Sequence, residues 1–272
     1  MYLKWAGGKR NLADKILSIA DRVDFNSLTE PFSGAAAVSC QYRKLGGAKP
    51  VRLYDSNPDL INLHASVAYG REFFLSFAEV TWSTFQRKDY FSVRDMFNSR
   101  TLSEYTQASL FLWMNKYGFN GLCRYNSSGG YNVSVGRQKS DPKLPRSEMI
   151  SFWRSFRQDE IAAMDFGKSM TLANSVRGDL FYCDPPYIGS GSFVDYTGSG
   201  FSMEQQVELA ERARMLADNG RYVIVSNSLC DEALAVYGNA DSIETVVAAR
   251  SISRNGNGRK PVGEIIAVYG IN

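Results

Sequence analysis

Four consecutive residues late in the chain, Asp184-Pro185-Pro186-Tyr187, are of types that can support group transfer. They follow segment 179–183 (DLFYC), in which four apolar residues come after Asp179, so we expect Asp184 at the end of a buried strand, with a rigid, donor-poor loop after it. Methyl transfer to an exocyclic amine of a nucleobase requires groups that localise the nitrogen lone pair. Asp184 and the Pro185 carbonyl can accept hydrogen bonds from such an amine, and Tyr187 offers a ring on which an extruded base can stack. The alternative is an ordinary turn at a strand end.

A second candidate set, Phe32, Gly34 and Asp55, is typical of a cofactor site. Gly34 follows a predicted strand and precedes an Ala-rich helix, where a missing side chain lets a ligand approach the backbone. Asp55 lies 55 − 34 = 21 residues further on, a position from which an acid accepts hydrogen bonds from ribose hydroxyls; it could instead cap the following helix. The Gly8-Lys9 pair lacks the flanking residues of a Walker loop, and no GxGxxG is present. The expected ligand therefore carries ribose but needs no phosphate cradle.

The net charge of +3 is too small to indicate nucleic-acid binding, but the basic residues are clustered. Between residues 111 and 157, eight basic residues face two acidic ones and are interleaved with aromatic residues, a mixture suited to following phosphates and stacking on bases. A smaller basic cluster lies within 250–260. Either cluster could instead be an ordinary solvated face. The interleaved aromatic residues are Trp113, Tyr117, Phe119, Tyr125 and Tyr131.

Length and composition exclude several classes of protein. With 272 residues, 44% hydrophobic and 22% charged, the chain suits one large domain or a domain with an insertion, and it is neither fibrous nor globally disordered. It has no apolar run of membrane-spanning length and no signal-peptide pattern at its N-terminus. Four widely spaced cysteines indicate reduced thiols in a cytoplasmic protein. His64 is the only histidine, which argues against Ser-His-Asp or Cys-His catalysis and most histidine metal sites, so no metal is expected.

The elements that must position these residues alternate as in a Rossmann-like α/β fold. Hydrophobic periodicity predicts helices at 11–22, 35–45, 203–218 and 229–237, and strands at 27–32, 51–54, 179–183, 222–226, 243–247 and 264–269. Residues 57–115 have a mostly helical pattern, and 116–143 suggest loop and hairpin. We therefore expect a catalytic domain of residues 1–56 and 146–272, interrupted by a mainly helical recognition insert, residues 57–145, that bears a β-hairpin.

Several segments, in this order, resemble the Dam family of DNA N6-adenine methyltransferases in its alpha arrangement, with the cofactor segment first, the recognition insert central and the catalytic loop last. The combination covers nearly the whole chain and is highly specific, whereas DPPY alone is only moderately so. A GxxG at 118–121 could suggest a KH domain, but the surrounding order of elements does not resemble one. The matching segments are YLKWAGGK (2–9), EPFSGAAAV (30–38), YDSNPDLIN (54–62), NKYGFNGLCRYN (115–126), NVSVGR (132–137), CDPPY (183–187) and ARSISRNG (249–256).

The resemblance implies a Rossmann-like methyltransferase that takes its methyl group from S-adenosylmethionine. It places Asp184, Pro185 and Tyr187 in the catalytic loop. The residues at the family's cofactor-binding positions are Trp5, Lys9, Phe32, Gly34, Asp55 and Asp184.

The resemblance also implies an adenine within duplex GATC as the target, flipped out of the helix. Lys4 matches a residue that contacts the first guanine, and Leu122 and Arg124 match residues that read later base pairs. Phe119 falls where an aromatic fills the gap left by the adenine, and Asn120 would contact the DNA backbone. The residues expected to bind DNA are Lys4, Phe119, Asn120, Leu122, Arg124, Ser134 and Arg137.

Three positions depart from the family pattern. Ala36 replaces the second glycine of the glycine loop, which crowds the cofactor or the helix packing. Phe119 replaces a tyrosine and keeps the stacking face. Ser134 replaces a common proline at a base-contacting position, so relaxed or altered reading of one base pair is an open alternative to strict GATC recognition.

Two other functions are open at this stage: a DNA-binding regulator on an inactive methyltransferase scaffold, and a methyltransferase acting on RNA or protein glutamine. The intact loop 184–187 and Asp55 argue against the regulator, and the duplex-reading insert argues against the other substrates. The expected partner is double-stranded DNA, with no membrane, no metal and no obligate protein partner, and the expected location is the cytoplasm.

Overall fold

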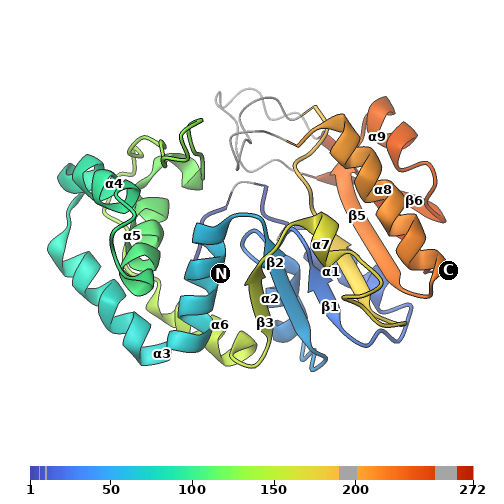
Figure 1. Ribbon diagram of the computed structural model, residues 1–272, viewed down its shortest axis with the longest axis horizontal. Coiled ribbons are helices and arrows are strands. Elements are labelled where there is room, and N and C mark those ends of the chain that lie inside the picture. The colour runs from blue at the N-terminus through green and yellow to red at the C-terminus, as the bar shows by residue number, and fades with distance from the viewer. Residues whose placement is uncertain (6, 10, 190–200, 249–261, 272) are drawn as a thin grey trace. The chain divides into compact units, whose positions relative to one another are not determined.

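The computed structural model of the protein describes residues 1–5, 7–9, 11–189, 201–248 and 262–271 (Figure 1). Contacts divide the chain into two compact units. The first contains Met1–Gly8 and Asn57–Ala163, and the second contains Lys9–Ser56 and the described residues after Ala163. The segment 249–256 that resembles the Dam family, and the smaller basic cluster around it, lie outside the described residues.

Six strands of the sheet belong to the second unit, in the spatial order β2-β1-β4-β5-β7-β6. The strands β2, β1, β4 and β5 are parallel, and β7 and β6 continue the sheet in antiparallel pairing. The chain places β2 on one side of β1 and later places β4 on the other, so the strand order reverses between β1 and β4. Ligands of α/β sheets bind beyond the carboxyl ends of strands at such a reversal. The bounds are β1 (Leu28–Glu30), β2 (Val51–Asp55), β4 (Leu180–Cys183), β5 (Tyr222–Ser228), β6 (Ser242–Ala248) and β7 (Val262–Tyr269).

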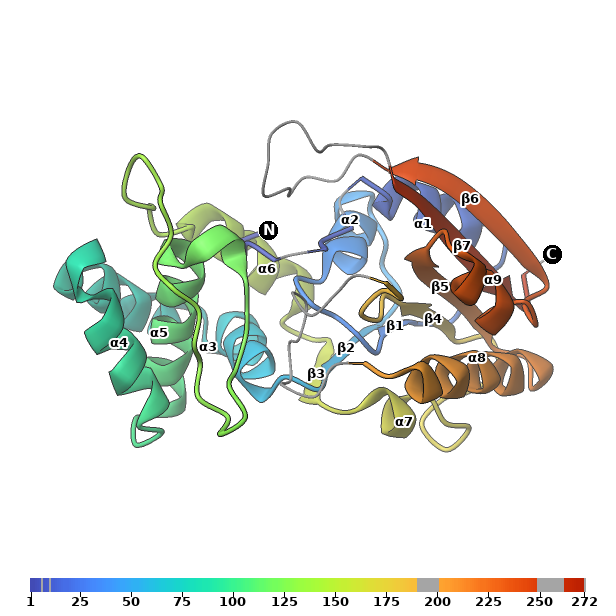
Figure 2. The same cartoon turned by 90° about the horizontal axis from the view of Figure 1, so that it is seen from above.

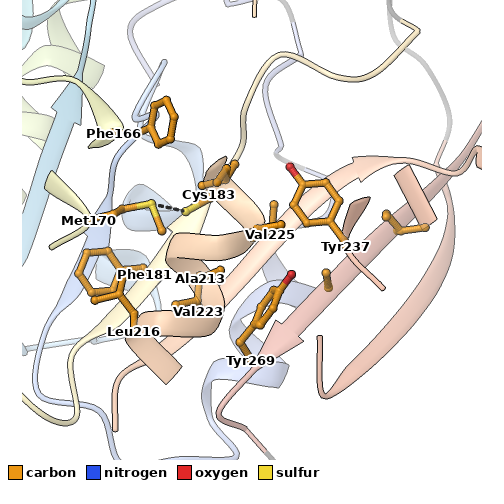
Figure 3. Packing of buried hydrophobic residues seen from close by; sticks show 14 of the residues in the cluster. Phe166, Met170, Phe181, Cys183, Ala213, Leu216, Val223, Val225, Tyr237 and Tyr269 are labelled. Atoms are coloured by element: carbon orange, nitrogen blue, oxygen red, sulfur yellow. Dashed lines mark hydrogen bonds between the residues drawn. The ribbon is translucent and has the colours of Figure 1, made fainter. Parts of the chain in front are cut away.

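Helices cover both faces of these strands. Figure 2 shows α1 and α2 on one side and α7 and α8 on the other. Because both faces are covered, all four positions of β4 are buried, and its sequence is apolar without alternation. On the α8 side, Phe181 and Val223 of neighbouring strands pack with Ala213 and Leu216 in one apolar cluster (Figure 3). The helices are α1 (Ala13–Ala20), α2 (Ala37–Lys44), α7 (Phe166–Ser169), α8 (Met203–Asp218) and α9 (Asp231–Val236).

The predicted elements of this unit are confirmed. The helix predicted at 203–218 is α8, and a capping box between Ser202 and Gln205 fixes its first turn. The two predicted edge strands are β6 and β7. The sequence did not reveal α7 or, in the first unit, β3 (Glu160–Ala163), since four residues are too few to show a period. It also missed α6 (Arg146–Phe156) of the first unit, although Met149, Phe152 and Phe156 have helical spacing.

The first unit is mainly helical. Its longest helix, α3, packs against α5 and α6 and is interrupted at Arg71, whose φ is 40°. Asn57 begins α3 by accepting hydrogen bonds from the backbone of Asp59 and Leu60, with Pro58 at the first helical position. The elements are α3 (Pro58–Thr84), η1 (Arg87–Asp89), α4 (Tyr90–Asn98), α5 (Glu104–Tyr117), η2 (Phe119–Gly121), α6 (Arg146–Phe156) and β3 (Glu160–Ala163).

The predicted hairpin is a loop joined by two isolated antiparallel bridges, Gly118 to Val135 and Tyr125 to Tyr131. The backbone N–H of Asn126 donates to the Gly130 carbonyl at 2.9 Å and closes the tip of this loop. The two arms therefore run antiparallel without forming a named strand. We call residues 118–137 the recognition loop.

One interpretation of the basic-aromatic segment is wrong. Trp113, Tyr117 and Tyr131 are buried and therefore belong to the core of the first unit instead of a base-stacking surface. Phe119, in contrast, is 40% exposed. Aromatic residues interleaved with cations cannot be assigned to a surface from sequence, because core packing requires the same residue types.

Within the ranges given above, no helix combines the length and apolar character that crossing a membrane requires.

Candidate active site

The predicted cofactor and catalytic residues of the second unit lie at the carboxyl ends of three adjacent strands. Phe32 and Gly34 follow β1, Asp55 is the last residue of β2, and Asp184 follows β4 directly. These three strands are parallel neighbours and include the point at which the strand order reverses. The topology thus brings together residues that the sequence presents in separate segments.

Asp184 is held by two side chains. The Lys9 ammonium lies 2.9 Å from its Oδ1, and the Ser226 hydroxyl donates to the same oxygen at 3.0 Å. The Asp184 side chain is 21% exposed and that of Lys9 only 9%. Burial raises the pKa of Asp184 above its ordinary value, and the Lys9 charge and the Ser226 hydrogen bond oppose that rise.

The Lys9 ammonium also lies over the Tyr187 ring, 4.3 Å from its centroid, which is a cation–π contact. The Tyr187 hydroxyl donates to Glu264 Oε2 at 2.6 Å. Burial, followed by the charge of Asp184, raises the pKa of Tyr187, so its hydroxyl stays protonated at neutral pH. A cation thus lies between the carboxylate and the aromatic ring that the sequence assigned to catalysis.

Hydrogen bonds with the side chains of three buried polar residues fix the backbone of loop 184–188. Gln206 of α8 donates to the Pro186 carbonyl at 2.8 Å. Asn227 accepts from the Ile188 N–H at 3.0 Å, and Ser228 donates to the Ile188 carbonyl at 2.6 Å. Because these partners are buried and mutually bonded, the loop has little freedom to change its backbone conformation.

The glycine turn after β1 is tied to Asp55. The Gly34 N–H donates to Asp55 Oδ2 at 3.0 Å, and Gly34 has a φ of 46°. Ala36 is also left-handed, with a φ of 54°, and is fully buried. An alanine in this conformation is strained by about 1 kcal/mol relative to glycine, so the departure at Ala36 affects the backbone as well as packing. Phe32 stacks on Phe166 with ring centroids 5.4 Å apart.

Glu30, the last residue of β1, is a buried acid that the sequence analysis did not select. It is 2% exposed, and its Oε1 accepts the backbone N–H of Ser39, in the first turn of α2, at 2.8 Å. Burial raises the pKa of Glu30 to about 7; the Ser39 hydrogen bond opposes the rise, and the Asp184 charge adds to it. The charge of Asp184 therefore acts on a second buried carboxyl, on the neighbouring strand.

The first unit brings the N-terminal segment to the recognition loop. Asn115 accepts from the Lys4 N–H at 3.0 Å and donates to the Lys4 carbonyl at 2.6 Å. The Lys4 ammonium donates to the Lys116 carbonyl at 3.1 Å. Gly121 lies so close that an added Cβ would be 2.4 Å from the Lys4 Cβ. Two segments of the Dam resemblance that are far apart in sequence are thus neighbours within this unit.

Most of the expected DNA-binding residues are exposed. Leu122 is half-buried, and its carbonyl accepts from the Tyr131 hydroxyl at 3.2 Å. Arg124 Nε donates to the Asn132 side-chain oxygen at 2.8 Å, across the two arms of the loop. Asn120 has a left-handed φ of 52°. The exposed members are Lys4, Phe119, Asn120, Arg124, Ser134 and Arg137.

Trp5 is half-buried and belongs to the first unit, whereas the other residues expected to bind the cofactor belong to the second. Its cofactor role stays a prediction. Ser226 and Asn227, which hold loop 184–188, were missed. Ser226 ends the predicted strand 222–226 and Asn227 follows it at the same sheet edge, so both could have been found from that rule. Gln206 and Glu264 gave no such signal, since only the tertiary structure brings them to the loop. In the described part of the chain, His, Cys, Asp and Glu side chains nowhere gather in threes or more as a metal ion would require.

Comparison with known proteins agrees with this geometry. Residues 5–252 match the family described as D12 class N6 adenine-specific DNA methyltransferase. The chain is 33% identical to the DNA adenine methylase of Vibrio cholerae, over 98% of this chain and 95% of that protein. It is 35% identical to the Retron Ec67 DNA adenine methylase of Escherichia coli, over 98% and 90%, and 34% identical to the DNA adenine methylase of Escherichia coli K12, over 98% and 94%. A match over nearly the whole length, at this identity, means that the chain belongs to the D12 class of N6 adenine-specific DNA methyltransferases.

Proposed function

We propose that this enzyme transfers a methyl group from S-adenosylmethionine to N6 of an adenine flipped out of duplex DNA, within GATC. The observation that carries the proposal is the setting of Asp184: a partly buried carboxylate at the strand reversal, near the Tyr187 ring and paired with the Lys9 ammonium. The DNA substrate would place the enzyme's action in the cytoplasm.

In this mechanism the residues of the catalytic loop prepare the amine. The Asp184 carboxylate and the Pro185 carbonyl accept its two hydrogens, which draws the nitrogen toward tetrahedral geometry and stabilises the positive charge that develops on it. Tyr187 stacks against the extruded ring. The extra proton then leaves to solvent, and no strong base is needed. S-adenosylmethionine, when bound, supplies the electrophilic methyl group.

The residues at the sheet edge fit that cofactor. Asp55 ends β2 where an acid can accept from ribose hydroxyls, and it already accepts from the Gly34 N–H. Gly34 is only partly buried, and the absence of a phosphate-binding fingerprint agrees with a ligand that lacks phosphate. We assign cofactor binding to Lys9, Phe32, Gly34, Asp55 and Asp184, together with Trp5.

DNA reading is assigned to the first unit. The exposed Lys4 and Arg124 would contact guanines through the major groove, and Phe119 would enter the gap left by the adenine. The recognition loop holds Arg124 through Asn132, which supports a fixed reading geometry. Ser134 is exposed in place of the family's proline, so we expect weaker selection at its base pair.

The decisive variant is Asp184→Ala. It should lower transfer of tritiated methyl groups to plasmid DNA by about 1,000-fold, because the acceptor of the amine is lost, while duplex affinity stays within about twofold. Asp218→Ala, which removes an exposed carboxylate paired with Arg214 on α8, is the matched control and should be fully active. Wild-type activity in Asp184→Ala would disprove the catalytic assignment.

Site specificity can be read on treated plasmid with restriction enzymes that differ in sensitivity to adenine methylation at GATC. Protection only from the methyl-sensitive enzymes supports GATC. Label incorporation without that protection would indicate another site. Incorporation blocked by unlabelled RNA or protein would favour those substrates, and tight DNA binding without incorporation would indicate a regulator.

A further inference from the structure

We propose that Ser226 and Tyr182 are positioning residues that orient the catalytic carboxylate through a relay of hydrogen bonds. This inference rests on the proposed function of Asp184. The Tyr182 hydroxyl lies 3.0 Å from the Ser226 hydroxyl, which lies 3.0 Å from Asp184 Oδ1. The two residues come from adjacent parallel strands, β4 and β5, at the edge where Asp184 emerges.

The direction of the relay follows from the chemistry of the groups. An ionised carboxylate can only accept, so Ser226 donates its single hydrogen to Asp184. The Ser226 oxygen then accepts from Tyr182, whose pKa burial raises well above its ordinary value, so that its hydroxyl stays a donor. Both side chains are buried, Ser226 completely, which excludes water from competing for these hydrogen bonds.

The relay determines which carboxylate oxygen faces the substrate. Both partners that the described residues give to Asp184, the Lys9 ammonium and the Ser226 hydroxyl, contact Oδ1. With Oδ1 fixed on two sides, the carboxylate cannot rotate freely, and Oδ2 is the oxygen left to accept from the adenine amine. Ser226 therefore supplies orientation and touches no reacting atom itself.

The relay also acts on the ionisation of Asp184, which several charged or titratable groups surround. Burial disfavours the carboxylate, whereas the Lys9 charge and the Ser226 hydrogen bond favour it, and the Asp184 charge in turn raises the pKa of Glu30 on β1. Cys183 and Tyr187 stay protonated because burial raises the pKa of each. Loss of the Ser226 hydrogen bond removes one of the contacts that favour the ionised form, so the pKa of Asp184 should rise further.

The test compares kinetic constants and pH profiles of Ser226→Ala with those of the wild type. We expect a kcat about 10- to 100-fold lower, with KM for DNA and for S-adenosylmethionine within about twofold. The acid limb of the kcat profile should move to higher pH. Ser226→Thr, which keeps the hydroxyl, should restore most of kcat and the position of the acid limb. Tyr182→Phe should lower kcat by a smaller factor, because it removes only the second bond of the relay.

Thr29→Val is the matched control: it removes a buried hydroxyl on β1 that has no hydrogen-bond partner among the described residues. It should leave kcat and the pH profile unchanged. The inference is wrong if Ser226→Ala retains wild-type kcat and acid limb, or if Ser226→Thr is as impaired as Ser226→Ala. Asp184→Ala in the same assay distinguishes failure of the proposed function from failure of the relay. Activity in Asp184→Ala would overturn the catalytic role of Asp184. An inactive Asp184→Ala together with a fully active Ser226→Ala would overturn only the relay.

Discussion

The two parts of the molecule to which we assign chemistry and DNA reading differ in how they hold their side chains. At the carboxyl edge of the second unit, Asp184 is fixed by side-chain contacts to buried Lys9 and Ser226. In the recognition loop of the first unit, Lys4 and Arg124 are exposed, and Lys4 is held mainly through backbone contacts to Asn115.

This difference has a physical reason. A reacting carboxylate needs one orientation and a low local dielectric, so buried partners that fix its oxygens are effective. A side chain that reads DNA must extend from the surface to a base edge, so its polar end stays exposed even where a neighbour holds it, as Asn132 holds Arg124. We therefore expect changes at the catalytic edge to alter turnover or stability, and changes in the recognition loop to alter DNA affinity.

The largest stability effect is expected at Glu30. Its pKa is about 7 in the folded protein and 4.5 as a reference, so the folded state binds more protons between these values. Its contribution to stability is complete below pH 4.5 and is lost as pH rises to about 7. Glu30→Gln keeps an acceptor for the Ser39 N–H and removes this loss. The free energy of unfolding of the variant minus that of the wild type should therefore increase by about 3 kcal/mol from pH 4.5 to pH 8.

Urea unfolding of both proteins at several pH values measures this gain. Glu211→Gln, at an exposed carboxylate of α8, is the control and should follow the wild type. A gain independent of pH would mean that Glu30 does not titrate in this range.

Arg124→Ala tests the recognition loop directly. Loss of a bidentate guanine contact should raise the Kd for GATC duplex by about 10- to 100-fold, with turnover at saturating DNA within about twofold. Fluorescence anisotropy and single-turnover methylation measure the two quantities. Arg94→Ala, whose guanidinium lies over Phe91 on α4, is the control. Equal weakening for every DNA sequence would show that Arg124 contacts phosphate instead of a base.

Gly121→Ala should weaken DNA binding by about tenfold, because its Cβ would meet the Lys4 Cβ at 2.4 Å and the Lys4 carbonyl at 2.9 Å. Gly129→Ala is a close control: the φ values are 66° and 75°, but an added Cβ at Gly129 meets nothing within 4 Å. The strain of a left-handed alanine is common to both, so the difference in Kd isolates the contact with Lys4. Similar Kd values in the two variants would show that the contact between residue 121 and Lys4 does not affect DNA binding.

The smallest effect is expected at Asn132→Ala. The Asn132 side-chain oxygen accepts from Arg124 Nε in an exposed setting, where one hydrogen bond contributes less than about 1 kcal/mol. The Kd for GATC duplex should rise about two- to fivefold. The double variant with Arg124→Ala should bind no more weakly than Arg124→Ala alone. Additive effects of the two changes would mean that Asn132 does not act through Arg124.

The sequence predicted the larger part of the fold. Continuous apolar runs at 180–183 and 222–225 predicted strands buried on both faces, and the acid directly after the first run predicted that this strand ends at Asp184. Short elements such as β3 and α7 escaped, because four residues cannot display a period. The aromatic residues near Arg124 were misjudged, since residue type alone does not distinguish a buried Trp113 from an exposed Phe119.

By itself the sequence determined most of the elements and the family, and it singled out loop 184–187 as the catalytic candidate, because periodicity and short motifs are local properties of the chain. Only the tertiary structure decided that Lys9 and Ser226 share one oxygen of Asp184, and that Lys4 lies against Gly121. Such contacts depend on strand order, register and helix packing, in which many weak interactions together bring distant segments into contact. No single residue encodes them, so the partners of a catalytic group appear only when the chain is folded.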